Sequence, residues 1–350
     1  MKKVKELNHL KYEKDNEQVF PSGKINPGIL QKLFSSVPSD KTVIVGPQVG
    51  EDAAVIKFKG EYLVVKTDPI TFTSQNLGWY VVNINANDVA CMGAIPRWFL
   101  LTILLPQKKI NQTFLNDTFN QLLSASKKLG VSLIGGHTEV TPRVSEPIAI
   151  GQMIGKVPKN KLIKSSGARV GDIILLTKGI AIEGTNVIYQ EKKEELKEKV
   201  SVSLLRSMKD FLYTPGISVV KEALLASEKV KVHCMHDPTE GGLKTGLWEI
   251  AYASGVGVRV KEEKIPILKE TQILCDIYKL DPLGLLASGA LILTLDPKEA
   301  DKLLDLYQKE GIRCVSIGEI VPKDDGINII EKGKSYHFST SYRDELNKIF

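Results

Sequence analysis

The sequence has no pattern for a structural metal site or a membrane anchor. Its four cysteines are far apart and form no C-x-x-C pair, which excludes a zinc ribbon or a redox dithiol and indicates reduced, buried thiols. No stretch approaches the roughly 18 to 20 apolar residues that cross a bilayer, and the N-terminal residues are too polar for a secretory signal. We therefore expect a cytoplasmic protein.

The most familiar motifs of nucleotide binding and hydrolysis are also absent. The sequence has no G-x-x-x-x-G-K-[ST] P-loop and no G-x-G-x-x-G after an expected strand, which disfavours the two commonest nucleotide folds. Ser288 lacks the G-x-S-x-G surroundings of a nucleophile elbow, and His137, His233 and His236 lack the spacing of zinc ligands. A hydrolase triad is therefore not expected.

What is present is the composition of an ordinary globular protein. The chain has 350 residues, of which 43% are apolar and 25% charged, and this length favours two domains. The net charge is +6, but the lysines are interleaved with acids along the whole chain. We therefore expect small anionic ligands rather than nucleic acid.

Composition along the chain suggests four segments. Residues 1–20 are polar and are expected to form a flexible N-terminal segment. Residues 21–157 mix strand and helix patterns and form the first predicted domain. Residues 158–168 are rich in lysine and serine and are the best candidate for a linker, and residues 169–350 form the second domain. The alternation of patterns predicts a two-domain fold of the α+β or α/β class.

Hydrophobic periodicity and turn residues predict the main elements. Strands are expected at 42–45, 52–58, 62–67, 98–105, 131–134, 148–157, 172–177 and 290–295, and near Val315 and Ile327. A helix is expected before Pro38, and others at 76–92, 111–130, 191–213, 239–253 and 297–310.

Four acidic residues stand beside small or apolar neighbours, which is unusual for a plain surface turn. Asp52 precedes two alanines, Asp68 ends an expected strand, Asp88 interrupts an apolar helix and Asp237 lies at a strand-to-helix junction. Taken singly, Asp68 and Asp237 are also explained as helix caps or turn residues. Brought together, the four would repel one another without a cation, and hard oxygen ligands favour magnesium. Magnesium in turn favours phosphates.

Two glycine pairs and one lysine point to a phosphate. Gly135-Gly136 is expected as a turn after an apolar strand, and Gly241-Gly242 opens an expected helix. Exposed backbone amides at such places bind anions. Lys24 lies in a glycine-containing segment from which it could reach a phosphate, although a solvated lysine explains it as well.

These motifs together resemble one superfamily. They are V-G-E-D-A-A-V-I (49–56), T-D-P (67–69), N-D-V-A-C-M-G-A-I-P (87–96), G-G-H-T-E (135–139), H-D-P-T-E-G-G (236–242) and G-E-I (318–320). Their order resembles the PurM-like superfamily, which contains aminoimidazole ribonucleotide (AIR) synthetase, selenophosphate synthetase, thiamine-monophosphate kinase and the hydrogenase-maturation carbamoyl dehydratase. The P-S-G-K opening, the N-D-V-A helix and the length are most similar to the hydrogenase-maturation branch.

The resemblance implies a fold, ligands and a site. It implies a PurM-like N-terminal domain, whose strands form a β-barrel shared by a homodimer and flanked by helices, and a PurM C-terminal-like α/β domain. ATP and magnesium would bind in a cleft between the N-terminal lobe and the neighbouring chain. The implied magnesium ligands are Asp52, Asp68, Asp88 and Asp237, and the implied nucleotide contacts are Asn87, Gly135, Gly136 and Thr138.

The implied activity is phosphoryl transfer from ATP that activates a small or protein-borne acceptor, by an enzyme of the phosphotransferase, ligase or dehydratase type. The hydrogenase-maturation dehydratase carries its substrate on a C-terminal cysteine, whereas this sequence ends N-K-I-F and its last cysteine is Cys314. We therefore do not carry over the nitrile-forming reaction. Two alternatives stay open: a small-molecule kinase or ligase resembling thiamine-monophosphate kinase or AIR synthetase, and a non-catalytic nucleotide-binding partner of maturation proteins.

Overall fold

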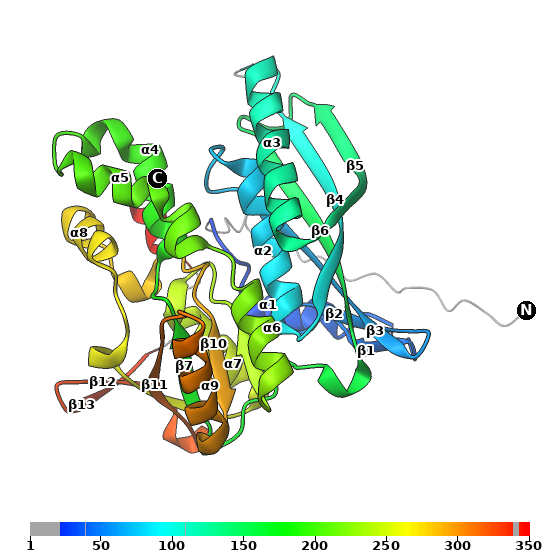
Figure 1. Ribbon diagram of the computed structural model, residues 1–350, viewed down its shortest axis with the longest axis vertical. Coiled ribbons are helices and arrows are strands. Elements are labelled where there is room, and N and C mark those ends of the chain that lie inside the picture. Colours follow the sequence, from blue (N-terminus) through cyan, green and yellow to red (C-terminus); the bar gives the residue numbers. More distant parts are fainter. Residues whose placement is uncertain (1–21, 39, 109, 339–342) are drawn as a thin grey trace, which may run out of the picture.

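The N-terminal lobe is built on one six-stranded sheet. The computed structural model describes residues 22–38, 40–108, 110–338 and 343–350, which form two lobes (Figure 1). The first sheet has the strand order β1-β2-β3-β6-β4-β5. Its lobe consists of α1 (Pro27–Phe34), β1 (Val43–Val45), β2 (Ala54–Phe58), β3 (Glu61–Ile70), α2 (Leu77–Cys91), β4 (Ile95–Leu105), α3 (Gln112–Leu129), β5 (Ser132–Val140) and β6 (Ile148–Val157).

The C-terminal lobe contains a seven-stranded sheet with the order β13-β12-β9-β11-β7-β10-β8. Its strands are β7 (Ile173–Thr177), β8 (Cys234–His236), β9 (Gly257–Lys261), β10 (Ile292–Leu295), β11 (Cys314–Val321), β12 (Ile327–Glu331) and β13 (Lys334–His337). Its α-helices are α4 (Ile182–Leu196), α5 (Val202–Asp210), α6 (Val220–Lys229), α7 (Gly242–Ser254), α8 (Lys269–Tyr278) and α9 (Pro297–Lys309). No helix in the described ranges is long and apolar enough to cross a membrane.

Helix α2 lies between the two lobes, and every one of its residues is buried. It packs against β3, β6 and α3 of its own lobe and against α6 and β8 of the other lobe. A helix that is covered on all sides needs no solvent-facing polar stripe, and the polar residues of α2 (Asn83, Asn85, Asn87 and Asp88) are buried with the rest. The one acid of α2, Asp88, lies at the space between the lobes.

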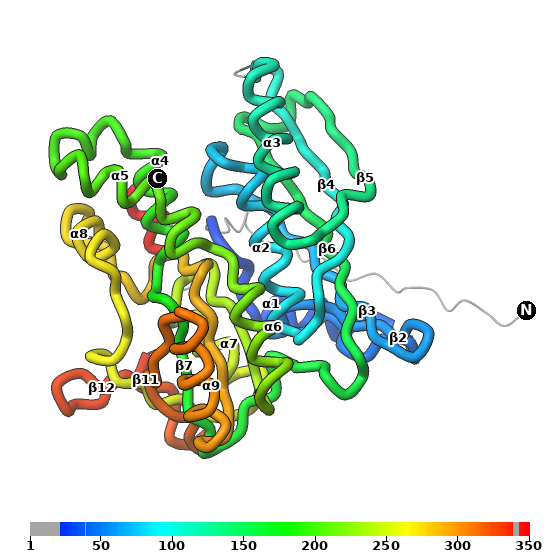
Figure 2. The backbone as a smooth tube through the Cα atoms, in the orientation of Figure 1, coloured from blue at the N-terminus to red at the C-terminus, as the bar shows by residue number. Residues whose placement is uncertain are grey.

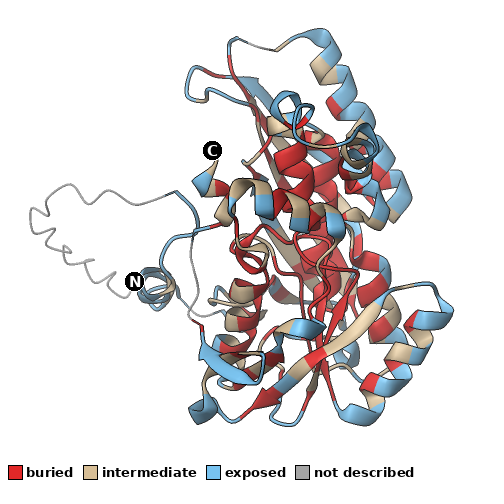
Figure 3. Cartoon of the chain, turned by 90° about the vertical axis from the view of Figure 1, so that its left-hand side faces the viewer, coloured by how far each residue is buried: buried red, intermediate tan, exposed pale blue. Residues whose placement is uncertain are grey.

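The two lobes share an apolar core. One hydrophobic cluster includes Val55, Tyr80 and Phe99 of the first lobe together with Ile188 and Leu293 of the second. Figure 3 shows buried residues running through both lobes. A second cluster lies within the C-terminal lobe.

The chain passes from β6 to β7 along the bottom of the view in Figure 2. The boundary at 158–168 stays a prediction, and the predicted flexible segment 1–20 lies outside the described residues.

Several elements agree closely with the sequence prediction. Helix α3 begins where Asn111 accepts a hydrogen bond from the backbone N–H of Phe114 at 2.9 Å. It ends at Gly130, whose φ of 66° is the left-handed conformation that closes a helix. Both ends therefore follow from local side-chain chemistry, which a sequence displays directly.

Two expectations are wrong. The expected turn at Gly135-Gly136 does not exist, because β5 continues through both glycines and pairs in parallel with β4. A Cβ at Gly136 would lie 1.9 Å from the carbonyl oxygen of Leu101, so this glycine permits close strand pairing. The long helix expected at 191–213 is instead two helices, α4 and α5, and α4 already begins at Ile182. Its first half is buried throughout and shows no amphipathic period.

Close packing of α2 on β6 leads to a stability prediction. A Cβ on Gly151 would lie 2.3 Å from Nδ2 of Asn85, which donates a hydrogen bond to the backbone oxygen of Asp68 at 3.2 Å. Gly151→Ala should therefore lower the free energy of unfolding by roughly 1–3 kcal/mol, because overpacking shifts α2 away from the sheet. Chemical denaturation measures this. Gly46→Ala is the control, since its nearest neighbour would lie at 3.6 Å, and equal stabilities of the two variants would contradict the packing.

Candidate active site

A cavity of about 210 Å³ lies between the lobes and is lined mainly by ionisable side chains. The N-terminal lobe contributes Asp52, Lys66, Asp68 and Asp88, and Lys24 lies at the same cavity. The C-terminal lobe contributes Glu183, His236, Asp237, Glu240, Glu249 and Ser288. Carboxylates outnumber cations, so the cavity attracts positive charge.

Each acid reaches the cavity from a different segment. Asp52 lies in the turn before β2, Asp68 in β3, Asp88 near the end of α2 and Asp237 directly after β8. Gly50 makes the first of these turns possible: its φ is +87°, and a Cβ there would lie 2.8 Å from the backbone oxygen of Glu249 in α7. Glycine therefore lets the turn that carries Asp52 press against the second lobe.

Asp68 and Asp88 share one lysine. Nζ of Lys66 lies 3.0 Å from Oδ1 of Asp88 and 3.3 Å from Oδ2 of Asp68. Burial raises the pKa of the Asp88 carboxyl well above its usual range, and Lys66 offsets this only in part. Burial also lowers the pKa of Lys66, but Asp88 and Asp68 outweigh this effect and leave that pKa well above its usual range. An internal ammonium group thus holds the two carboxylates together.

Asp52 and Asp237 belong to a second group. One oxygen of Asp52 contacts Nδ1 of His236, whose Nε2 lies 2.9 Å from Glu249. The other oxygen of Asp52 accepts a hydrogen bond from Oγ of Ser165 at 3.0 Å. Burial lowers the pKa of His236, but Asp52 and Glu249 outweigh it and raise that pKa well above its usual range. The ring is therefore an imidazolium that orients Asp52.

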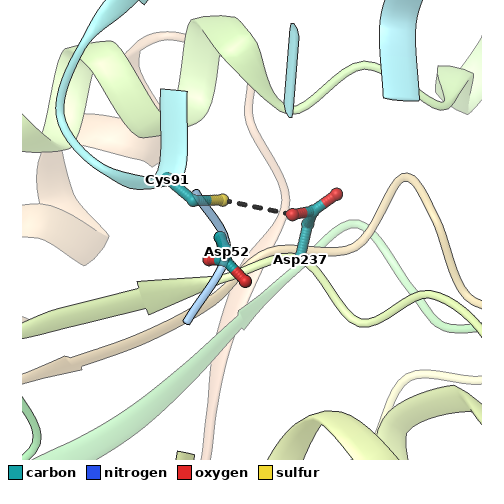
Figure 4. A group of neighbouring side chains, drawn as sticks. All are labelled: Asp52, Cys91 and Asp237. Atoms are coloured by element: carbon teal, nitrogen blue, oxygen red, sulfur yellow. Dashed lines mark hydrogen bonds between the residues drawn. The ribbon is translucent and has the colours of Figure 1, made fainter. Parts of the chain in front are cut away.

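Asp237 is the most deeply buried acid of the second group. Its Oδ1 accepts a hydrogen bond from Sγ of Cys91 at 3.5 Å (Figure 4). Burial first, and then the charge of Asp52, raise its pKa to about 7. Oδ2 of Asp237 and Oδ2 of Asp88 are both buried with no hydrogen-bond partner. Buried polar atoms without a partner are rare, and these two would be satisfied by a cation.

The structure brings the four predicted magnesium ligands together, and it separates the remaining candidates. Lys24 reaches the cavity, where its Nζ lies 3.1 Å from Oε1 of Glu249. Asn87 is buried outside the cavity, and its side chain binds the backbone of Ile217 and Val219. Gly135, Gly136 and Thr138 lie on β5, which is exposed along its whole length at the sheet edge. Their contact with a nucleotide stays a prediction.

Sequence analysis missed several residues of this site, most importantly Glu183. It lies in the first turn of α4, is 6% exposed, and has a pKa raised to about 8, mainly by burial. Its signal in the sequence is a lone acid between Ile182 and Gly184 in an apolar stretch. Lys66 and Glu249 show no comparable signal, because their roles depend on partners that are distant in the sequence.

The carboxylate set fits magnesium. Mg²⁺ takes oxygen ligands and usually keeps several waters, so it needs only one or two protein carboxylates for each ion. Asp68 with Asp88, and Asp52 with Asp237, are two such pairs. Since the second pair also has a thiol beside it, the two halves of the cavity differ in chemistry.

The shared lysine leads to a prediction about stability and magnesium. Lys66→Gln leaves Asp68 and Asp88 without their internal cation, and breaking a buried ion pair costs about 3 kcal/mol. We expect this loss in urea denaturation without magnesium, and a smaller loss when MgCl₂ is added, because the ion replaces the ammonium group.

Lys221→Gln is the matched control. Lys221 lies 3.3 Å from Glu310 in an exposed pair, and such pairs contribute at most about 1 kcal/mol. If Lys66→Gln were as stable as the unaltered protein in the absence of magnesium, Lys66 would not be the counter-charge described above.

Comparisons with known proteins agree with this architecture. The pattern for the AIR synthase related protein, N-terminal domain, matches residues 50–157, and the pattern for the C-terminal domain matches residues 169–330. The carbamoyl dehydratase HypE of Rhizobium leguminosarum bv. viciae is 28% identical over 311 residues, covering 86% of this chain and 83% of that protein.

Further matches include a relative with a different named activity and a solved structure. The thiamine-monophosphate kinase of Buchnera aphidicola subsp. Schizaphis graminum is 29% identical over 330 residues, covering 89% of this chain and 96% of the kinase. A crystal structure of the hydrogenase maturation protein HypE in complex with ATP matches with a TM-score of 0.64 at 24% identity, covering 90% of each chain. With both domain patterns matched in order along most of its length, this chain belongs to the AIR synthase related family.

Proposed function

We propose that the protein binds ATP with magnesium in the cavity between its lobes and transfers the terminal phosphoryl group to an acceptor, as a HypE-like enzyme. The observation that carries this proposal is the convergence of Asp52, Asp68, Asp88 and Asp237 on one cavity, with two buried carboxylate oxygens that lack partners. The names of the relatives support it, because one is a kinase and another was crystallised with ATP.

In the proposed complex, the two pairs of aspartates would each bind one cation. Asp68 and Asp88 would hold one magnesium ion, and Asp52 and Asp237 would hold another cation. Magnesium, when bound, neutralises charge that develops on a transferred phosphoryl group. His236 orients Asp52, because its two ring nitrogens form hydrogen bonds with Asp52 and Glu249.

Glu183 is the candidate for proton transfer to or from the acceptor. It projects from the C-terminal lobe into the same cavity, and its pKa of about 8 lets it hold a proton at neutral pH. A carboxyl group with a pKa near the working pH is suited to moving a proton to or from an acceptor. We therefore assign it a proton-transfer role rather than a metal-binding one.

Two candidate activities differ in the acceptor that receives the phosphoryl group. The relatives named carbamoyl dehydratase favour an acceptor with a carbamoyl-type oxygen, and a relative named as a hydrogenase expression/formation protein favours a role in hydrogenase maturation. A small-molecule kinase is the second candidate, because the kinase relative matches over 96% of its own length. A kinase would yield ADP and a phosphorylated acceptor, so product analysis over an acceptor panel distinguishes them. Nucleotide binding without turnover for any acceptor would instead favour a non-catalytic maturation partner.

The first test is calorimetric titration of ATP with and without MgCl₂. We expect binding that depends on magnesium, and we expect Asp68→Asn to weaken it at least about tenfold, or about 1.4 kcal/mol, because one ligand of the ion is lost. Asp301→Asn on the exposed side of α9 is the control and should bind as the unaltered protein does. If neither the unaltered protein nor either variant binds ATP, the proposed function is wrong, and only the similarity of fold remains.

We also propose that the protein is a homodimer that pairs through β5. All nine residues of this edge strand are exposed, including the apolar Leu133, Ile134 and Val140. Phe119 and Leu123 of α3 are exposed as well. An exposed apolar edge strand is prone to pair with another chain unless it is covered. A second copy of this chain would cover it and would bring Gly135 and Gly136 into an interface.

The dimer is tested by light scattering of the purified protein. Ile134→Glu should convert a dimer of the unaltered chain into a monomer, because it places a charge in the apolar contact. Val202→Glu changes a residue of α5 that is 73% exposed, and it should leave the dimer intact. A monomeric unaltered protein would contradict this arrangement.

A further inference from the structure

We propose that Asp344 is a positioning residue for the active site: from behind the cavity wall of the C-terminal lobe, it holds the two segments of chain against which Glu183 is placed. The inference rests on the proposed function, in which Glu183 transfers a proton. It adds to the site a residue that does not itself line the cavity.

Asp344 is a buried carboxylate in the C-terminal segment, residues 343–350. It is 1% exposed and directly precedes a 3-10 helix at Glu345–Lys348. Its Oδ1 accepts a hydrogen bond from the backbone N–H of Leu346 at 2.9 Å, which caps this helix. Its Oδ2 accepts one from the backbone N–H of Gly241 at 2.8 Å. The side chain therefore ties the C-terminal segment to the turn that begins α7.

The hydrogen bonds of Asp344 explain why this residue carries a charge. Burial raises the pKa of its carboxyl group to about 6, and backbone N–H groups that bond to the carboxylate oppose this rise. These groups belong to Leu346, Gly241 and Leu286. An ionised carboxylate only accepts hydrogen bonds, whereas an asparagine would turn its own N–H groups toward one of these donors. Three segments of the chain thus depend on one acidic side chain.

Two of these segments form a wall of the cavity. Thr239 and Glu240, which directly precede Gly241, line the cavity, and so do Leu286 and Ser288. The backbone N–H of Ala287 donates a hydrogen bond to the backbone oxygen of Thr239 at 3.2 Å, which joins the two segments. Since Asp344 bonds to both and does not line the cavity, it supports this wall from behind.

The segment at 286–288 places Glu183. The backbone N–H of Glu183 donates to the backbone oxygen of Ser288 at 3.3 Å, and that of Gly184 donates to the backbone oxygen of Leu286 at 2.9 Å. Helix α4 has no side-chain cap at its first turn, so these backbone contacts determine where the turn lies. A shift of the segment would therefore shift Glu183.

The charge of Asp344 also reaches Glu183. Burial is the largest cause of the raised pKa of Glu183, and a hydrogen bond from Ser288 opposes it. Among the charged neighbours that raise this pKa, Asp344 has the largest effect, ahead of Asp68 and Asp237. Like charges disfavour the ionised form of a carboxyl group. The position and the charge of Asp344 both help Glu183 to keep its proton at neutral pH.

The rest of the C-terminal segment is anchored without Asp344. Oε2 of Glu345 accepts a hydrogen bond from the backbone N–H of Asp281 at 2.9 Å, and Leu346 is fully buried. Figure 1 shows the C-terminus beside α4, where Nζ of Lys192 lies 5.4 Å from the centre of the Phe350 ring. Replacing Asp344 should therefore loosen the wall and leave the segment in place.

The experiment measures the pKa of Glu183 by carbon-13 NMR of the full chain, with labelled glutamate carboxyl groups and without nucleotide. Glu183→Gln identifies the resonance. We expect a pKa of about 8 in the unaltered protein. Asp344→Asn should lower it by at least about 1, or about tenfold in proton affinity, because a negative charge is lost and water gains access to the carboxyl group. A general loss of stability would not move this pKa, since the titration reports the folded protein.

Asp296→Asn is the matched control. Asp296 also accepts a backbone hydrogen bond at the start of a helix, from Lys298 at 3.1 Å, but it lies at α9 and should leave the titration of Glu183 unchanged. An unchanged titration in Asp344→Asn would overturn the proposal, as would an ordinary pKa of Glu183 in the unaltered protein.

A second measurement needs no variant. The amide of Gly241 in the unaltered protein should be protected from hydrogen exchange, because it donates to a buried carboxylate, and rapid exchange would contradict the wall contact on which the proposal depends. Because nucleotide is absent from both experiments, their failure and the failure of the ATP titration are separate results.

Discussion

Repulsion between carboxylates in the space between the lobes is the constraint on which the structure depends. Asp52, Asp68, Asp88 and Asp237 converge there, and Glu183, Glu240 and Glu249 add further acids. Removing these groups from water is costly unless opposite charges or metal ions accompany them. The structure supplies an ammonium group at one pair and an imidazolium beside the other. The packing of α2 fixes the position of Asp88, and the turn at Gly50 fixes the position of Asp52.

The sequence predicts most of the acid cluster because its members look out of place locally. An acid inside the apolar helix that contains Asp88, or before two alanines as at Asp52, has no structural reason to be there. Asn111 and Gly130 likewise reveal both ends of α3, since capping is a local effect. Where a feature depends on neighbours in sequence, or on an acid in an apolar setting, prediction succeeds.

Features that depend on distant partners could not be predicted. Gly135-Gly136 looks like a turn, and only its pairing with β4 keeps it extended. The first half of α4 shows no amphipathic period, because both of its sides are covered. The contacts of Lys66 with Asp88, and of Cys91 with Asp237, join residues that the folded chain alone brings together. Tertiary packing decided each of these cases.

The apolar core that runs through both lobes has a mechanical consequence. A protein that closes on its ligands by rotating one domain against another needs an interface that can slide or separate. Here such a rotation would pull apart the hydrophobic cluster that contains α2. A shared core therefore favours a fixed arrangement of the two lobes, and with it fixed positions for the acids that both lobes contribute. The geometry of the acid cluster would then be set when the chain folds rather than when a ligand arrives.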